Sequence, residues 1–208
     1  RSSITTLRRR SSRSTCRSAC RSGSDRRDAG RSAVRGKLGG RQSSVFSVPS
    51  RAAVYAADDL DAPDAYRASC AAALASSDPP RAVAKQCFHL FKKIREIDRL
   101  MTPALEARVY EVHPEVAFWR LKGSALDQPK KIQNRPYASG LEERKALLTA
   151  EGLPPPLFDT VPKGAAADDL IDAAACALIA RRIARGVAEP FPGDFRRDRR
   201  GLRMAIWA

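Results

Sequence analysis

Apolar side chains recur every three to four residues through the central segment 81–101. These positions form one stripe along a helix of 3.6 residues per turn: Val83, Cys87, Leu90, Phe91, Ile94, Ile97 and Met101. Proline disfavours helical backbone in the residue before it, so Pro103 predicts where this helix ends. The pattern therefore predicts one continuous amphipathic helix.

Shorter segments on both sides also have helical patterns. Residues 62–75 are rich in alanine, and Pro114 suits the first turn of a helix that Gly123 would end. Ser139 and Glu142 have capping-box spacing, which predicts that another helix begins there.

The longest remaining helical pattern opens at Asp168 and stops at Gly186. Basic residues occupy its last turn, where their positive charge interacts favourably with the negative end of the helix dipole. Its predicted buried side consists of Leu170, Ile171, Ala174, Ala175, Leu178, Ile179 and Ile183.

Strand patterns are scarce. Residues 108–112 (RVYEV) and 201–208 (GLRMAIWA) are β-prone, so the order of elements predicts an α/β fold. Two strands cannot make a stable sheet, which indicates that part of the sheet is missing.

The basic charge of the chain is concentrated at one end. Residues 1–42 contain 13 Lys and Arg against 2 acids, a net charge of +11, whereas the other 166 residues contain 25 against 21, a net of +4. Such a segment is either an arm that binds nucleic acid or a solvated, disordered tail. The charge alone leaves both interpretations open.

Five cysteines, with no CxxC pair, argue against a disulfide framework or a structural zinc site. We therefore expect a reducing, cytoplasmic setting. No apolar run is long enough to span a membrane and no signal peptide is recognisable, so no membrane partner is expected. The oligomeric state cannot be inferred.

Three carboxylates are candidates for metal chemistry. Glu111 lies within a β-prone run, and Asp169 and Asp172 share a helix face. Together they could hold Mg²⁺, which prefers oxygen ligands, and a pair of such ions can cleave a phosphodiester. The simpler interpretation is that Asp169 interacts favourably with the positive end of the helix dipole and that Glu111 lies on a solvated strand edge.

His113, two residues after Glu111, is a candidate general base. A structural hydrogen bond is the preferred interpretation, because a lone histidine usually makes one. The sequence contains no GxGxxG, GxxxxGK[ST] or GxSxG motif.

Several stretches of the chain resemble domain-of-unknown-function family four-two-nine, whose members are described as predicted RNase H-like nucleases related in fold to Holliday-junction resolvases. The EVHPE and DDxxDA motifs, in that order with SSVF upstream, carry the resemblance. The matching stretches are residues 40–55, 92–101, 111–123, 142–148, 168–186 and 201–207. The loop at 130–140 looks longer than usual for the family.

The resemblance implies a mixed sheet flanked by helices, with Mg²⁺ or Mn²⁺ as cofactor and nucleic acid as partner. Glu111 would be the mid-chain carboxylate and Asp172 the helix carboxylate, with Asp169 beside it. Arg41, Ser43 and Ser44 would line the same cleft, and His113 would lie near the substrate.

The family should begin with two strands that carry catalytic Asp residues, and neither is present. If residues 10–22 are encoded by GC-rich codons, a shift of one frame permits Val-Ile-Ala-Val-Asp-Met-Pro-Val-Gly-Leu-Pro-Val, which matches the second missing strand. We therefore expect residues 1–30 to be a disordered, out-of-frame segment. Residues 31–208 would be an RNase H-like domain without its N-terminal strands.

These observations predict a relative of metal-dependent nucleases that is inactive as it stands. The alternatives are a non-catalytic nucleic-acid-binding protein with a basic arm, or a non-enzymatic remnant that binds another partner.

Overall fold

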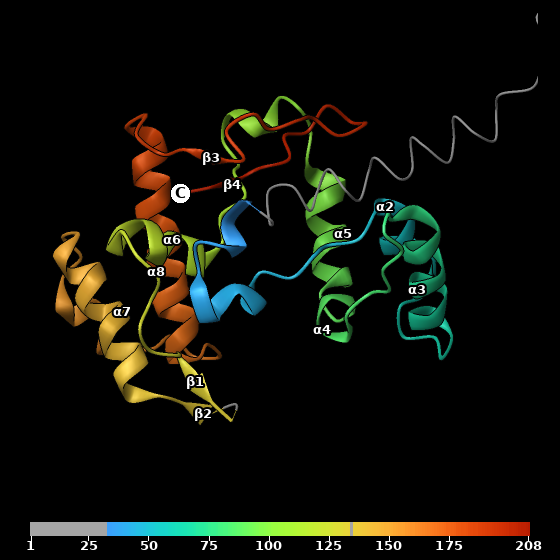
Figure 1. The fold of residues 1–208 in the computed structure, drawn as a ribbon. Coiled ribbons are helices and arrows are strands. Elements are labelled where there is room, and N and C mark those ends of the chain that lie inside the picture. Colours follow the sequence, from blue (N-terminus) through green and yellow to red (C-terminus); the bar gives the residue numbers. More distant parts are fainter. Residues whose placement is uncertain (1–32, 134) are drawn as a thin grey trace, which may run out of the picture. The chain divides into compact units, whose positions relative to one another are not determined.

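The computed structural model describes residues 33–133 and 135–208 (Figure 1). The prediction made for residues 1–30 lies outside the described residues. The described chain divides into two compact units. Unit 1 is Ser47–Leu100, and unit 2 joins residues 33–46 to Met101–Ala208.

Unit 1 is helical. It contains α2 (Arg51–Val54), α3 (Ala65–Ser76), α4 (Lys85–Phe88) and α5 (Phe91–Leu100). Its buried apolar residues are Ala53, Val54, Ala65, Ala73, Val83, Cys87 and Phe91. The helix predicted at 62–75 is confirmed as α3. The single helix predicted at 81–101 is wrong, because the chain makes a tight turn at His89 and Leu90, where the Leu90 amide donates to the Cys87 carbonyl at 3.0 Å.

The buried side of α5 also differs from the prediction. Arg95 is buried and donates to the carbonyl oxygens of Val54, Ala57 and Asp58 at 2.5–3.1 Å. Ile97 is 57% exposed and Leu100 67% exposed. The carbonyls after α2 need a hydrogen-bond donor that an apolar stripe cannot supply, so an arginine takes the inner position.

Unit 2 is built around α8 (Ala167–Ala184), against which α6 (Pro114–Lys122) and α7 (Ala138–Ala150) both pack (Figure 1). Unit 2 also contains three short 3₁₀ turns: η1 (Gly39–Ser44) and η2 (Leu105–Ala107), which both precede α6, and η3 (Pro155–Phe158), which lies between α7 and α8. The buried side of α8 faces the core, as predicted, and includes Ile171, Ala175, Leu178 and Ile179. Val34 and Leu38, far earlier in the chain, belong to the same core.

The helix ends of unit 2 follow the predicted stop signals in two places. Gly123 (φ 78°) and Gly186 (φ 70°) both adopt left-handed backbone after α6 and α8, which glycine does without steric cost. The predicted cap at Ser139 is wrong. The N-cap of α7 (Ala138–Ala150) is Tyr137, two residues before the predicted cap, and no side-chain hydrogen bond caps the helix.

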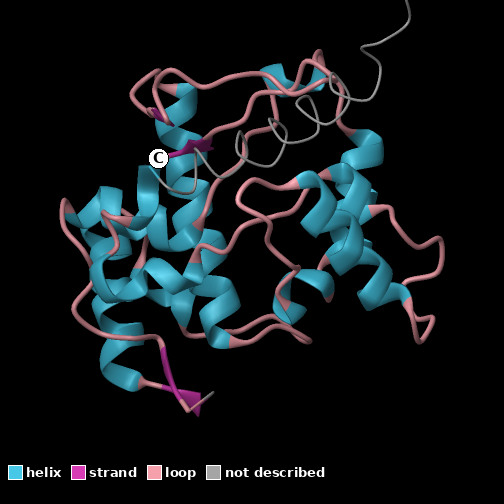
Figure 2. Ribbon diagram, turned by 45° about the vertical axis from the view of Figure 1, so that its right-hand side comes forward, coloured by secondary structure: helices cyan, strands magenta, loops and turns pink. Residues whose placement is uncertain are grey.

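Strands are few and short (Figure 2). β1 (Lys131–Ile132) pairs with β2 (Arg135–Pro136), and β3 (Pro190–Phe191) pairs with β4 (Ile206–Trp207), both antiparallel. The described chain is therefore mixed α/β, as predicted, with two small antiparallel sheets.

The C-terminal strand is confirmed as β4, but the predicted strand at 108–112 is not formed. This segment runs beside β4 and accepts one bond, from the Trp207 amide to the Glu111 carbonyl at 2.8 Å. A two-residue neighbour offers too few partners to extend a ladder. In the described part of the chain, no helix is both long enough and apolar enough to cross a lipid bilayer.

Candidate functional site

The first two turns of α8 present three aspartates in two different ways. Asp168 and Asp172 are four residues apart and lie on the same inner face, and Asp168 is only 3% exposed. Asp169 is exposed, and its Oδ2 accepts a hydrogen bond from the Ala166 amide at 3.0 Å. Asp169 thus caps its own helix, while Asp168 is the residue paired with Asp172.

Two lysines from the start of the β1–β2 hairpin meet these aspartates. The Lys130 ammonium lies 2.5 Å from Asp172 Oδ2 and 3.5 Å from Asp168 Oδ2. The Lys131 ammonium lies 2.8 Å from the same Asp168 oxygen. Lys130 is therefore shared between two carboxylates.

A buried ion pair lies next to these contacts. Arg144 of α7 is fully buried and donates to Glu115 of α6 at 2.7 Å. The charge of Glu115 acts on both Lys130 and Asp172. We call the six side chains the charge cluster, which contains three acids and three bases: Glu115, Lys130, Lys131, Arg144, Asp168 and Asp172.

The segment that carries Lys130 is fixed by α7. The carboxylate of Glu143 accepts hydrogen bonds from the amides of Asp127 and Gln128 at 3.0 and 2.9 Å. Arg144 donates to the Gln128 carbonyl at 3.2 Å, and the Tyr137 amide donates to the Lys130 carbonyl at 2.9 Å. These bonds position the lysine from both sides.

Gly140 allows this segment to approach α7 closely. A methyl group at its Cα would lie 1.7 Å from the Pro129 carbonyl oxygen and 2.5 Å from its carbonyl carbon. No side chain fits there, so the position of Pro129, and with it Lys130, depends on a glycine.

Burial and mutual charge shift the ionisation of the cluster. Burial raises the pKa of Asp172, and the nearby charges of Glu115 and Asp168 add to this rise against the opposing contact with Lys130. Burial acts the same way on Asp168, but its contacts with Lys131 and Lys130 outweigh it and lower the pKa of Asp168. Burial opposes charging of Lys130, yet Asp172 and Asp168 raise the pKa of Lys130.

Three buried carboxylate oxygens accept no hydrogen bond from the described residues: Glu115 Oε2, Asp168 Oδ1 and Asp172 Oδ1. Oxygens of this kind suit Mg²⁺ chemically. The arrangement does not fit a metal, however, because Lys130 stands between the two aspartates. Within residues 33–133 and 135–208, no group of three or more His, Cys, Asp or Glu side chains is placed to hold a metal ion.

The sequence of the chain matches a known protein family. A family model described as a protein of unknown function (DUF429) matches residues 14–197. The chain belongs to this family. The match spans the whole charge cluster and confirms the resemblance at the level of the family. No curated protein and no solved structure matches the chain.

The other residues predicted for the site of this DUF429 chain lie on η1 and before α6. The Nε2 atom of His113 lies 3.2 Å from the carbonyl oxygen of Ser44, which is the structural hydrogen bond preferred from the sequence. The Ser44 hydroxyl donates to the Arg41 carbonyl at 2.7 Å. Ser43 and Glu111 are exposed. The structure thus brings His113 and Ser44 together, and Asp172 together with Asp168.

The sequence interpretation missed Glu115, Lys130, Lys131 and Arg144. Glu115 and Arg144 lie in stretches that carry the DUF429 resemblance, in EVHPE and EERK, whereas Lys130 and Lys131 lie in the loop at 130–140, which departs from the family pattern. An acidic residue straight after a helix-starting proline is ordinarily attributed to the helix dipole, which hides the role of Glu115.

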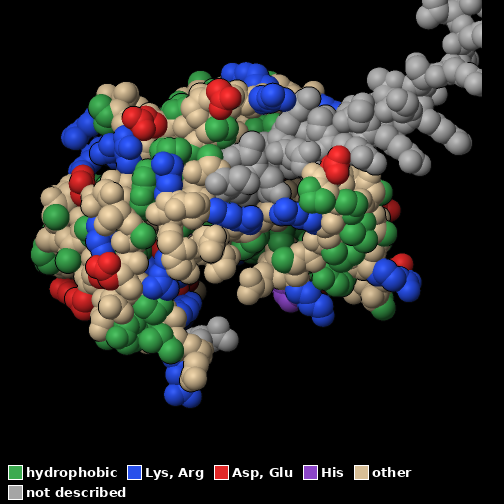
Figure 3. Space-filling model, in the orientation of Figure 1, with side chains coloured by type: hydrophobic (Ala, Val, Ile, Leu, Met, Phe, Trp, Pro, Cys, Tyr) green, Lys and Arg blue, Asp and Glu red, His purple; other side chains and the backbone are tan. Residues whose placement is uncertain are grey.

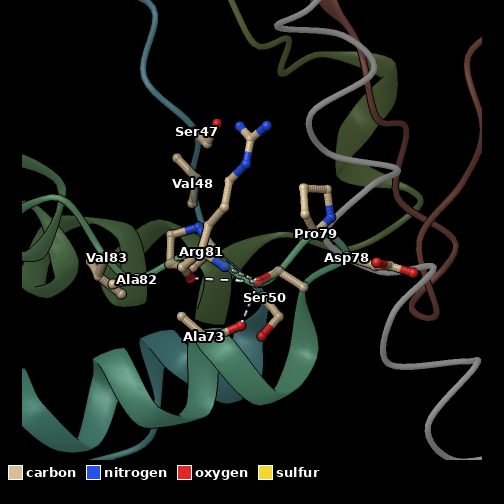
Figure 4. A pocket seen from close by; sticks show the side chains of 11 residues that line it. Ser47, Val48, Ser50, Ala73, Asp78, Pro79, Arg81, Ala82 and Val83 are labelled. Carbon is tan, nitrogen blue, oxygen red and sulfur yellow. Dashed lines mark hydrogen bonds between the residues drawn. The ribbon is translucent and has the colours of Figure 1, made fainter.

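Two other surface features of the DUF429 chain offer less chemistry. On the visible face of unit 2, basic and acidic side chains are interspersed and form no single basic patch (Figure 3). A pocket in unit 1 is lined by Ser47, Ser50, Asp78, Pro79 and Arg81, among others (Figure 4). The hydroxyl groups of Ser50 and Ser76 share a hydrogen bond of 2.6 Å.

Proposed function

We propose that this chain is a relative of nucleases that act on nucleic-acid phosphodiesters, and that the charge cluster is the surviving part of the reaction centre. The observation that supports this is that Glu115 and Asp168 are buried, and Asp172 half-buried, each with an unsatisfied buried oxygen beside three bases. Burying charge costs free energy, so the two buried acids and the buried Arg144 would be an expensive way to meet a purely structural need. Perturbed carboxylates of this kind concentrate at functional sites.

The chemistry of the cluster suits a phosphodiester. Lys130 and Lys131 are partly exposed at its rim, where ammonium groups can neutralise phosphate oxygens. Asp172, whose pKa is raised, can accept a proton from an attacking water more readily than an ordinary aspartate. The oxygens of Asp172 and Asp168 that would act on substrate are at present engaged by the lysines.

We propose that this chain does not cleave nucleic acid. Residues 1–208 do not contain the motifs of the two carboxylate-bearing strands that the family resemblance implies, and the three acids of the charge cluster are balanced by three bases. A site without net negative charge holds divalent metal poorly, and metal-dependent cleavage needs carboxylates around the scissile phosphate.

The test is a cleavage assay of the full chain with Mn²⁺ on single-stranded and branched nucleic acids. The expected result is no cleavage above that of the Asp172→Asn variant. Robust cleavage that is lost in Asp172→Asn or Glu111→Gln would show that the chain has a complete active centre, and the proposal of inactivity would then be rejected.

A second candidate function, non-catalytic binding of nucleic acid, is favoured by the charge distribution. Residues 1–32 contain 10 Lys and Arg against 2 acids. Their deletion spares Val34 and Leu38, which are buried in unit 2. If this segment binds phosphates, its removal should weaken binding to nucleic acid and flatten the dependence of log K on log salt concentration. Unchanged affinity and slope would exclude a binding arm.

A further inference from the structure

Lys130 has the surroundings of a bound cation. Its ammonium group lies between one oxygen of Asp172 and one of Asp168, at 2.5 and 3.5 Å. The two aspartates are four residues apart on one helix, so their spacing is set by α8 and not by flexible loops. The acidic half of this arrangement does not depend on Lys130 for its geometry.

The acids next to Lys130 have more acceptor capacity than the bases use. Asp168 Oδ1 and Glu115 Oε2 are buried and accept no hydrogen bond from the described residues, and the two side chains are only 3% and 6% exposed. A single ammonium group donates three hydrogen bonds at most. A hydrated divalent ion carries twice the charge and brings several waters, which could satisfy oxygens that the lysine leaves unpaired.

The charge balance decides which cation the site accepts. With Lys130 in place, three acids face three bases. Without it, Glu115, Asp168 and Asp172 face only Lys131 and Arg144, and the cluster carries a net charge of −1. One or two carboxylates with water are enough for Mg²⁺ or Mn²⁺.

We propose that the Lys130 ammonium group occupies a divalent-cation position between Asp168 and Asp172, so that the native chain excludes metal there and a neutral residue at position 130 opens the site. The proposal rests on the proposed function only in placing that function's site in the charge cluster. Metal binding is measured without nucleic acid, so a failure to cleave and a failure to bind metal are separate results.

The experiment is a titration of Mn²⁺ alone into the full chain at pH 8, followed by the loss of the free-ion electron paramagnetic resonance signal. Lys130→Met should bind one Mn²⁺ at least tenfold more tightly than the native chain. Adding Asp172→Asn to that variant should abolish the gain. Lys130→Arg keeps the positive charge and should behave like the native chain.

Lys122→Met is the matched control. Lys122 also contacts two carboxylates, those of Asp127 and Glu143 at 2.7 Å, but Glu143 is already held by two backbone amides. This variant should gain no Mn²⁺ site. Equal gains in the Lys122 and Lys130 variants would show a general effect of charge and overturn the proposal.

Folding does not leave the test undecided. If Lys130→Met lacks native circular dichroism without metal, millimolar Mn²⁺ should restore it, and failure to restore it counts against the proposal. The proposal is likewise overturned if a folded Lys130→Met binds Mn²⁺ no more tightly than the native chain, or if the native chain already binds Mn²⁺ in a manner that Asp172→Asn abolishes.

Discussion

Gly140→Ala is the substitution whose effect the structure specifies most sharply. In an ordinary helix position, alanine is favoured over glycine by about 1 kcal/mol, and Gly140 lies inside α7 without left-handed backbone. A methyl group there would lie 1.7 Å from the Pro129 carbonyl oxygen. The substitution therefore has two opposite effects: a small gain in helix propensity and a severe clash with the Pro129 carbonyl.

The clash is expected to dominate. Cβ contacts below 3.0 Å essentially do not occur, so the Pro129 carbonyl must retreat by more than about 1.3 Å. Overpacking of this kind costs about 1–3 kcal/mol. Because the contact is with backbone and not with a flexible side chain, we take the upper half of this range, which leaves a net loss of about 1–2 kcal/mol after the helix gain.

The free energy of unfolding should be measured by urea denaturation of both Gly140→Ala and Ser139→Ala. Ser139 is exposed in the same turn, so its alanine variant gains helix propensity without a clash and should be as stable as the native chain or more so. If Gly140→Ala were also as stable as the native chain, the close approach of Pro129 to α7 would be wrong, and with it the positioning of Lys130.

Other changes test the remaining parts of unit 2. Arg144→Met leaves the buried carboxylate of Glu115 without its ion-pair partner and should lower the free energy of unfolding, measured by urea denaturation, by about 3–5 kcal/mol. Adding Glu115→Gln should recover part of this loss. A loss below about 1 kcal/mol would contradict the ion pair. Although burial opposes it, the contacts of Glu143 with Lys122 and two amides lower its pKa below the ordinary value of 4.5, so its contribution is present above that pH and is lost on acidification. Stability measured from pH 7 to pH 3 should fall less steeply in Glu143→Gln, and an unchanged slope would refute this. Glu106 is buried against two arginines of the C-terminal segment, and Glu106→Ala should cost about 1.5–3 kcal/mol and speed proteolysis of that segment; unchanged proteolysis would count against this anchor.

The parts of the fold that depend on neighbouring residues could be predicted from the sequence. Pro114, Gly123 and Gly186 set helix ends through their own backbone preferences, and these ends lie where the pattern places them. The capping signal at Ser139 failed for a different reason. The start of α7 is determined by its contacts with the segment before β1, including the bond from Tyr137 to Lys130, and no local pattern reports these.

In the candidate site too, features set by neighbouring residues could be predicted, and contacts between distant residues could not. Asp172 could be found because it lies in a motif on a helix. Its partner Lys130 lies 42 residues earlier, and Arg144 reaches Glu115 across 29 residues. Helix spacing places both Asp168 and Asp169 near Asp172, at i,i+4 and i,i+3, so it could not separate Asp168, which faces the cluster, from Asp169, which caps its own helix. Arg95 illustrates the point in unit 1, since only packing against distant carbonyls explains its burial.

The most direct test of the central claim introduces the strand that the family resemblance implies. A chain in which residues 10–22 are encoded in the alternative frame would contain the Asp that the family resemblance implies. The chain also carries Lys130→Met, because the Lys130 ammonium otherwise occupies the cation position between Asp168 and Asp172. The measurement is the single-turnover rate of Mn²⁺-dependent cleavage of branched and single-stranded nucleic acid by this modified chain. The account predicts cleavage that falls at least 100-fold in Asp172→Asn. A modified chain that folds and binds Mn²⁺ but does not cleave, or one whose rate is unchanged by Asp172→Asn, would contradict the assignment of the charge cluster to a phosphodiester-cleaving centre.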